Sequence, residues 1–161
     1  MSHVARARSR LNEISKYFDD RGIIIKKEEI QKPGGYRYTL IHNGSDIGES
    51  YFVVADDSIT FMNVEVRKTG YYLGVLLHAY IFLEFYLNQG IQMVHLDDMS
   101  DNYRQPNNWN YLLGLQYDSD DGPEMTGTIS KLLDQDLHFI VNKSRAKVFS
   151  FGRDTKYLRS I

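Results

Sequence analysis

One long apolar segment constrains the fold more than any other feature of this 161-residue chain. Residues 71–87 are nearly all apolar, but Gly74, His78 and Glu84 interrupt them. The segment also falls short of the roughly 20 apolar residues that a membrane span needs. We therefore expect a buried helix in a soluble protein, ending at Gly90, where a helix cap requires a left-handed backbone. Short apolar segments flank this helix at residues 59–66 and 91–96, so the order predicts a βαβ crossover with one parallel strand pair.

The first part of the chain predicts one helix followed by antiparallel strands. Leu11, Ile14 and Phe18 recur at helical spacing, which indicates an amphipathic helix over residues 4–18. Asn43-Gly44 is a strong hairpin signal, because both central residues of a type I′ turn need positive φ. Turn residues separate four expected strands, at residues 23–30, 36–42, 47–54 and 59–66. The prediction is one α/β (α+β) domain over residues 1–161, with a mixed, mostly antiparallel sheet.

The last third of the chain gives weaker patterns. Residues 101–110 are polar and include Pro106, and residues 107–113 favour a short helix. Residues 137–141 and 147–151 read as the two strands of a terminal hairpin. Edge pairing through this hairpin would form a homodimer, which we expect in preference to a monomer.

Composition limits the partners that the protein can have. The formal charge of −2 gives no broad attraction to nucleic acid. His3, Arg6, Arg8 and Arg10 form either the solvated face of the first helix or a small phosphate-binding patch. The basic N-terminus lacks the apolar stretch of a signal peptide, so we expect a cytoplasmic protein without a membrane partner. Nucleic-acid binding through strand aromatics beside the basic helix is the least favoured hypothesis.

Three segments carry a resemblance to a known family. In "HNGSDIGESYFVV", Gly48 follows a hairpin turn. In "ITFMNVEVRKTGYYLGVLLHAY", a strand leads to Arg67, two residues later to Gly70, and then to a helix. In "IQMVHLDDMSDNYRQPNNWNYLLGLQYD", a strand precedes Asn102, Tyr111 and a glycine. Together, residues 36–117 resemble the GCN5-related N-acetyltransferase (GNAT) superfamily, which implies a GNAT-like acyl-CoA N-acyltransferase fold.

The resemblance implies a function and a cofactor. Members transfer an acetyl group from acetyl-CoA directly to a primary amine, carried by a small molecule or by a protein, without a covalent enzyme intermediate. A chain without cysteine suits such chemistry. The loop before the main helix would receive the pyrophosphate of coenzyme A on backbone N–H groups. The cofactor-binding residues that this implies are Val64, Val66, Arg67, Gly70, Tyr71, Tyr72 and Asn102.

Two residues are candidates for proton transfer. Glu65 lies on the strand before the loop, and partial burial would raise the pKa of such a carboxyl towards neutrality, which suits a general base. The other interpretation of Glu65 is an exposed strand carboxylate. Tyr111 corresponds to the family's tyrosine, whose phenol would protonate the departing thiolate. His78, His95 and Asp97 lack a third ligand at metal spacing, so we expect no metal site.

An alternative hypothesis keeps the fold without the acetyl transfer. The family pattern after Arg67 ends in Gly or Ala, and this chain has Tyr72 there, whose side chain could obstruct the pyrophosphate. Tyr111 lies three residues before Gly114, where four is usual. A catalytically degenerate binding or interaction module, or a transferase using another acyl donor, is therefore the second candidate, because a fold alone does not establish a function.

Overall fold

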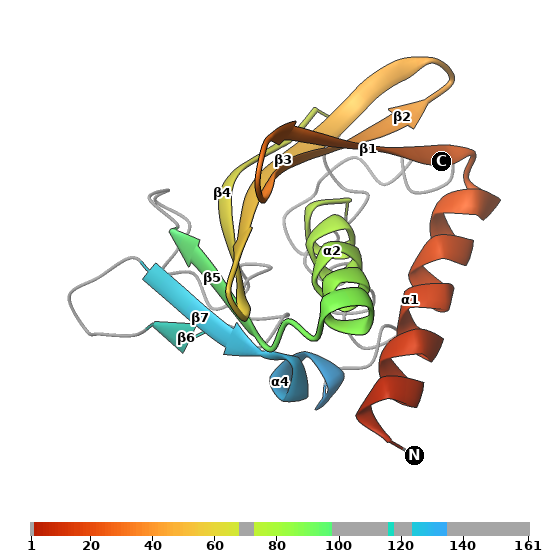
Figure 1. Ribbon diagram of the computed structural model, residues 1–161. Coiled ribbons are helices and arrows are strands. Elements are labelled where there is room, and N and C mark those ends of the chain that lie inside the picture. The colour runs from red at the N-terminus through yellow and green to blue at the C-terminus, as the bar shows by residue number, and fades with distance from the viewer. Residues whose placement is uncertain (1, 68–72, 98–115, 118–123, 135–161) are drawn as a thin grey trace.

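A computed structural model describes residues 2–67, 73–97, 116–117 and 124–134 of the chain (Figure 1). Along the chain, one helix is followed by four strands, a second helix and further strands, which is the order that the hydrophobic periodicity of the sequence predicts. In order they are α1 (His3–Asp20), β1 (Ile23–Gln31), β2 (Gly35–His42), β3 (Ser45–Ala55), β4 (Ser58–Val66), α2 (Leu73–Gln89), β5 (Met93–Asp97), β6 (Gln116–Tyr117), β7 (Glu124–Thr128) and α4 (Ile129–Asp134).

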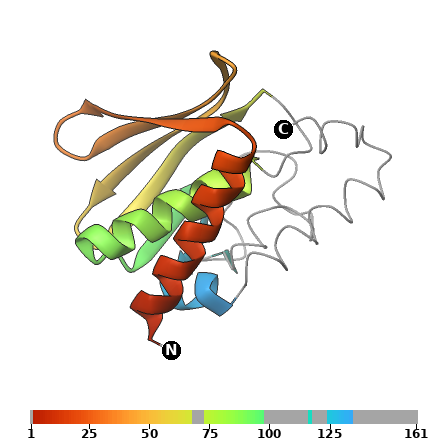
Figure 2. The ribbon, with the colours of Figure 1, turned by 90° about the vertical axis from the view of Figure 1, so that its right-hand side faces the viewer.

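The described strands form one seven-stranded sheet in the order β1-β2-β3-β4-β5-β7-β6. Every neighbouring pair is antiparallel except β4 and β5, which run parallel and are connected through α2. The predicted fold class is therefore confirmed: a mixed, mostly antiparallel sheet with a βαβ crossover. Helices α1, α2 and α4 lie on the same side of this curved sheet, and no described helix covers the other side (Figures 1 and 2).

Local sequence signals place the turns. Asn43 and Gly44 have φ of 51° and 77°, as a type I′ turn requires, and they connect β2 to β3. Gly22 and Gly90, which follow α1 and α2, also have positive φ, at 69° and 72°. The Ser2 side chain accepts a hydrogen bond from the Ala5 N–H and caps the start of α1. These short-range features explain why most predicted boundaries lie within two residues of the observed ones.

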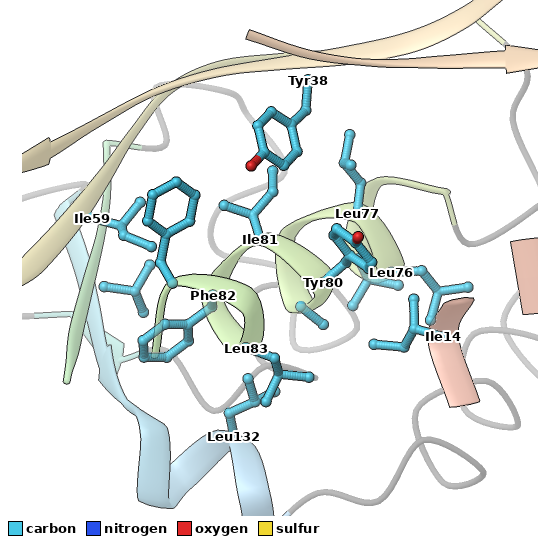
Figure 3. Close-up of a cluster of buried hydrophobic side chains, with 14 of the residues drawn as sticks. Ile14, Tyr38, Ile59, Leu76, Leu77, Tyr80, Ile81, Phe82, Leu83 and Leu132 are labelled. Atoms are coloured by element: carbon cyan, nitrogen blue, oxygen red, sulfur yellow. The ribbon is translucent and has the colours of Figure 1, made fainter. Parts of the chain in front are cut away.

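Helix α2 is the centre of the core (Figure 3). It is buried on nearly all sides, as its uniformly apolar sequence predicts, because the sheet, α1 and α4 all pack against it. Burying such a Leu or Ile side chain stabilises the fold by roughly 1.5–3 kcal/mol. The fully buried side chains come from all of these layers and include Ile14, Phe18, Leu40, Phe52, Ile59, Phe61, Leu76, Leu77 and Ile81.

The arginines of the first helix have a structural role that the sequence did not reveal. The Arg10 guanidinium donates a hydrogen bond of 2.7 Å to the Leu132 carbonyl, and Arg6 donates one to the Leu133 carbonyl. Both carbonyls belong to α4, whose last C=O groups have no partner within the helix. The solvated face and the phosphate patch are therefore both wrong for these two arginines, which join α1 to α4.

Two predictions fall on residues outside the described ranges. The terminal hairpin at 137–151 is one, and the helix at 107–113 is the other. A single domain over residues 1–161 also stays a prediction.

Candidate functional site

A β-bulge in β4 sets the geometry of the candidate site. Phe52 of β3 pairs with Phe61, but Tyr51 pairs with Asn63, so Met62 is an extra residue on β4. Side chains alternate along a strand, and one extra residue reverses that alternation. Before the bulge, Phe61 is buried against the helices, and beyond it Asn63 is exposed.

Beyond this bulge β4 separates from β5. The parallel pairing ends at Phe61 and Leu96, and among the described residues nothing in β5 pairs with residues 62–66. The Arg67 N–H donates to the Ile47 carbonyl of β3 at 2.9 Å. Because backbone groups alternate along an antiparallel strand, the N–H groups of Val64 and Val66 point away from β3, towards the side where β5 has diverged. Within the described part of the chain, no strand pairs with these two N–H groups.

Gly48 of β3 and Gly74 of α2 both lie against the end of β4, and of the two only Gly48 is too close to it for a larger residue. The Val66 side chain lies between Gly48 of β3 and Gly74 of α2. A Cβ atom on Gly48 would come within 3.2 Å of the Glu65 carbonyl oxygen, which is tighter than ordinary contact, whereas one on Gly74 would lie 3.6 Å from the Val66 methyl. The position of Gly48 in the family hairpin thus has a packing reason, because a larger residue would press on β4.

Arg67 is surrounded by carboxylates on the side of the sheet away from the helices. Its guanidinium nitrogens lie 2.6 Å from Asp46, 3.6 Å from Glu49 and 3.4 Å from Glu65. Glu49 and Glu65 are direct cross-strand neighbours, a like-charge pair that is destabilising unless a cation lies between them. Arg67 supplies that cation and fixes the end of β4 against β3.

The structure corrects one premise about Glu65. Its side chain is 55% exposed and paired with Arg67, so the expected partial burial is wrong, and a role as general base rests on its position one residue from Val64 and Val66. Sequence reasoning missed Asp46 and Glu49, which share this cluster. The Asn43-Gly44 turn places Asp46 near the start of β3, but the β2–β3 register shifts between Leu40 and Ile41, and the partner of Glu49 on β4 depends on the bulge.

A buried polar pair lies under the same part of the sheet. Ser50 of β3 and His78 of α2 are both fully buried, and the Ser50 Oγ lies 2.9 Å from the His78 Nε2. The imidazole also stacks on the Phe61 ring at a centroid distance of 3.9 Å. Burial lowers the pKa of His78 to about 3, so the ring is neutral at physiological pH. Its contacts make it part of the packing between α2 and the strands.

The remaining candidate residues lie outside the described ranges. They are Gly70, Tyr71 and Tyr72 of the loop before α2, together with Asn102 and Tyr111. The described part of the site therefore consists of Val64, Glu65 and Val66 at the end of β4 and of Arg67, which follows the strand.

Among the described residues, no group of three or more His, Asp or Glu side chains is arranged to hold a metal ion. No described helix is long and apolar enough to cross a membrane.

Taken together, the sheet order, the parallel β4–β5 pair, the α2 crossover and the divergence of β4 from β5 agree with the GNAT-like fold that the sequence resemblance implies. The solved structures that show a likeness to the chain include two transferases. One is the ribosomal-protein-S18-alanine N-acetyltransferase from Escherichia coli, at 20% identity and a TM-score of 0.46, over 62% of this chain and 72% of that one. The other is a cAMP-binding acyltransferase from Mycobacterium smegmatis, E234A mutant, at 12% identity and a TM-score of 0.44.

The coverage of the second structure is uneven, since the match spans 89% of this chain but 60% of that acyltransferase. No protein-family model matches the chain, and no curated protein matches it in sequence.

Proposed function

We propose that this protein is an N-acyltransferase that moves an acetyl group from acetyl-CoA to a primary amine. The observation that carries the proposal is the separation of β4 from β5 after Phe61 and Leu96. It leaves the N–H groups of Val64 and Val66 available to an extended ligand, which can add to a strand edge through main-chain hydrogen bonds. The pantetheine arm of coenzyme A is such a ligand, because it carries two amide groups in a row.

The same strand offers the groups that direct acyl transfer needs. Acetyl-CoA supplies a thioester whose carbonyl carbon accepts the amine. A strand N–H can stabilise the carbonyl oxygen as charge develops on it, which is a large term in acyl transfer. Glu65, one residue from both valines, is our candidate for removing the ammonium proton, and Tyr111 for protonating the thiolate. The carboxylates near Arg67 favour a cationic acceptor, because negative surfaces concentrate cations.

A calorimetric titration with acetyl-CoA tests the binding step. We expect micromolar affinity in the native protein and loss of binding in Val64→Pro, because proline removes an N–H from the open side of β4. Since the Val64 N–H does not point at β3, the β3–β4 pairing should survive, and circular dichroism checks this. Val64→Ala is the matched control and should bind normally, because it keeps the N–H.

Absence of binding by the native protein would contradict the proposal. The second hypothesis, a module of this fold without acetyl transfer, would then stand. Binding that appears only in Tyr72→Gly would show that this side chain blocks the pyrophosphate site and would also favour the second hypothesis.

The chemical step can be followed by the release of free thiol from acetyl-CoA. The chain contains no cysteine, so every thiol detected comes from coenzyme A. Acceptors to be compared are a polyamine, an amino sugar and a lysine peptide. We expect Glu65→Gln to lower kcat by about 10²–10⁴-fold while leaving acetyl-CoA affinity unchanged, as removal of a general base does. Asp46→Asn is the control, because it changes the same charge cluster without removing the candidate base.

If Glu65→Gln keeps full activity across the pH range, Glu65 is not the base. Glu49, its cross-strand neighbour, would then be the next variant to measure.

A further inference from the structure

Strand β1 ends the sheet, and no described strand pairs with its outer edge (Figure 1). Such an edge presents a row of backbone N–H and C=O groups that can pair with another strand. β1 also exposes apolar side chains, since Ile24 is 65% and Ile30 is 45% exposed. Both are among the few large apolar residues that the described part of the chain leaves in solvent.

Charged residues lie between these two isoleucines on the same side of the strand. Lys26 and Glu28 contact each other at 3.1 Å, and Glu28 also contacts Arg37 of β2 at 3.1 Å. Lysines on an edge strand normally oppose pairing, because a second strand would bring like charges together. In the order Ile24, Lys26, Glu28, Ile30, an apolar residue stands at each end and two opposite charges stand in the middle. Two copies of this strand that run antiparallel can therefore place lysine opposite glutamate and isoleucine opposite isoleucine.

Backbone geometry limits the registers in which two β1 strands can pair. Only alternate residues direct their N–H and C=O groups to the outer edge, so paired residues must both be even-numbered or both odd-numbered. A symmetric antiparallel pair therefore has one residue opposite itself on the two-fold axis. Three registers use the middle of the strand, with Lys26, Lys27 or Glu28 on the axis.

The side chains select one of these registers. With Lys26 or Glu28 on the axis, a charge meets its own copy, which is destabilising. With Lys27 on the axis, Lys26 lies opposite Glu28 of the second copy, and Ile24 lies opposite Ile30. All four cross-strand contacts on that side are then favourable.

Lys27 itself faces the helices and already has partners there. Its ammonium lies 2.5 Å from the Glu84 carboxylate and 2.8 Å from the Tyr80 hydroxyl, both on α2. The two lysines that meet at the axis are therefore each neutralised within their own chain. A register shift between Glu29 and Gln31 makes Ile30 an extra residue of β1, so the regular strand ends at Glu29 and Ile30 lies at the end of the pairing.

We propose that β1 pairs antiparallel with β1 of a second copy of this chain, about a two-fold axis at Lys27. The sequence of the strand specifies a second copy as the partner, because in the antiparallel pair Lys26 lies opposite Glu28 and Ile24 lies opposite Ile30. The two sheets then join edge to edge. This interface differs from the terminal hairpin expected from the sequence, and it does not depend on the proposed acyl transfer.

Sedimentation of charge-swapped variants tests this pairing. Lys26→Glu brings two carboxylates together at each contact and Glu28→Lys brings two ammonium groups together, so each variant should raise the dimer dissociation constant about tenfold or more. An equimolar mixture of the two variants should recover a heterodimer, since each altered residue then meets its opposite charge. Lys16→Glu on α1 makes the same charge change elsewhere and should leave the dimer intact.

Three outcomes overturn the proposal: a native protein that sediments as a monomer at every concentration, single variants that dimerise normally, or a mixture that stays monomeric.

Cross-linking reports the register even if a charge variant fails to fold. The chain has no cysteine, so Ile24→Cys together with Ile30→Cys introduces the only thiols. Within one chain these positions are six residues apart on an extended strand, about 20 Å, too far for a short bismaleimide. We expect a covalent dimer linked from position 24 to position 30, and almost none from Ile24→Cys alone. A 24-to-24 link, or no link, contradicts the register.

Discussion

At the scale of single residues, the buried His78 makes stability depend on pH. Burial lowers its pKa from 6.5 to about 3, so between these values the unfolded chain binds a proton that the folded chain does not. This group leaves the free energy of unfolding unchanged above pH 6.5 and lowers it as the pH falls from 6.5 towards 3. We expect the free energy of unfolding to fall by about 1.4 kcal/mol per pH unit in this window because of this group. Urea denaturation between pH 7 and pH 4 measures it.

Carboxylates also titrate in part of this range, so a variant must isolate the histidine. His78→Gln removes the titrating ring and keeps a polar side chain near the Ser50 hydroxyl. The slope of stability against pH between 6.5 and 5 should be shallower in this variant, whatever its absolute stability. Equal slopes in the two proteins would show that His78 is protonated in the fold.

At the scale of elements, a polar cluster joins β1 and β2 to α2. The Glu84 carboxylate, 13% exposed, accepts hydrogen bonds from the Tyr38 and Tyr80 hydroxyls and pairs with Lys27. Burial and the bond to Glu84 raise the pKa of Tyr38. Burial alone would lower the pKa of Lys27, but its bonds to Glu84 and Tyr80 raise it above its usual value. Tyr38 therefore stays neutral and Lys27 stays charged in the fold.

We expect Glu84→Gln to destabilise the protein by about 1–3 kcal/mol, because it leaves a partly buried ammonium without its counter-ion. In a double-mutant cycle with Lys27→Met, the coupling energy should be about 0.5–3 kcal/mol. The exposed pair Lys16 and Asp20, 2.8 Å apart on α1, is the control, and its cycle should give about 0.5 kcal/mol or less. Similar coupling in both cycles would show that the Glu84 cluster adds nothing beyond a surface ion pair.

At the scale of the whole molecule, the features that were predictable are those with short-range causes. The Asn43-Gly44 turn follows from positive φ, and the burial of α2 follows from its apolar sequence. The parallel pairing of β4 and β5 follows from the length of the connection between them. The strand expected at residues 59–66 corresponds to β4, which contains Val64, Glu65 and Val66, and Arg67 follows it.

The features that were not predictable depend on partners distant in sequence. The Met62 bulge arises from pairing with β3, and it decides which side of the sheet carries Glu65. Arg67 meets Asp46 and Glu49 only because β3 and β4 are in that register. Arg6 and Arg10 bind carbonyls more than a hundred positions away.

The sequence by itself thus determined the elements, their turns and the class of sheet, because periodicity and backbone preference are properties of neighbouring residues. Only the tertiary structure decided where the pairing of β4 with β5 ends, which N–H groups of β4 point away from β3, and which carboxylates surround Arg67. Those depend on strand register, and register is fixed by the packing of the whole sheet against α2.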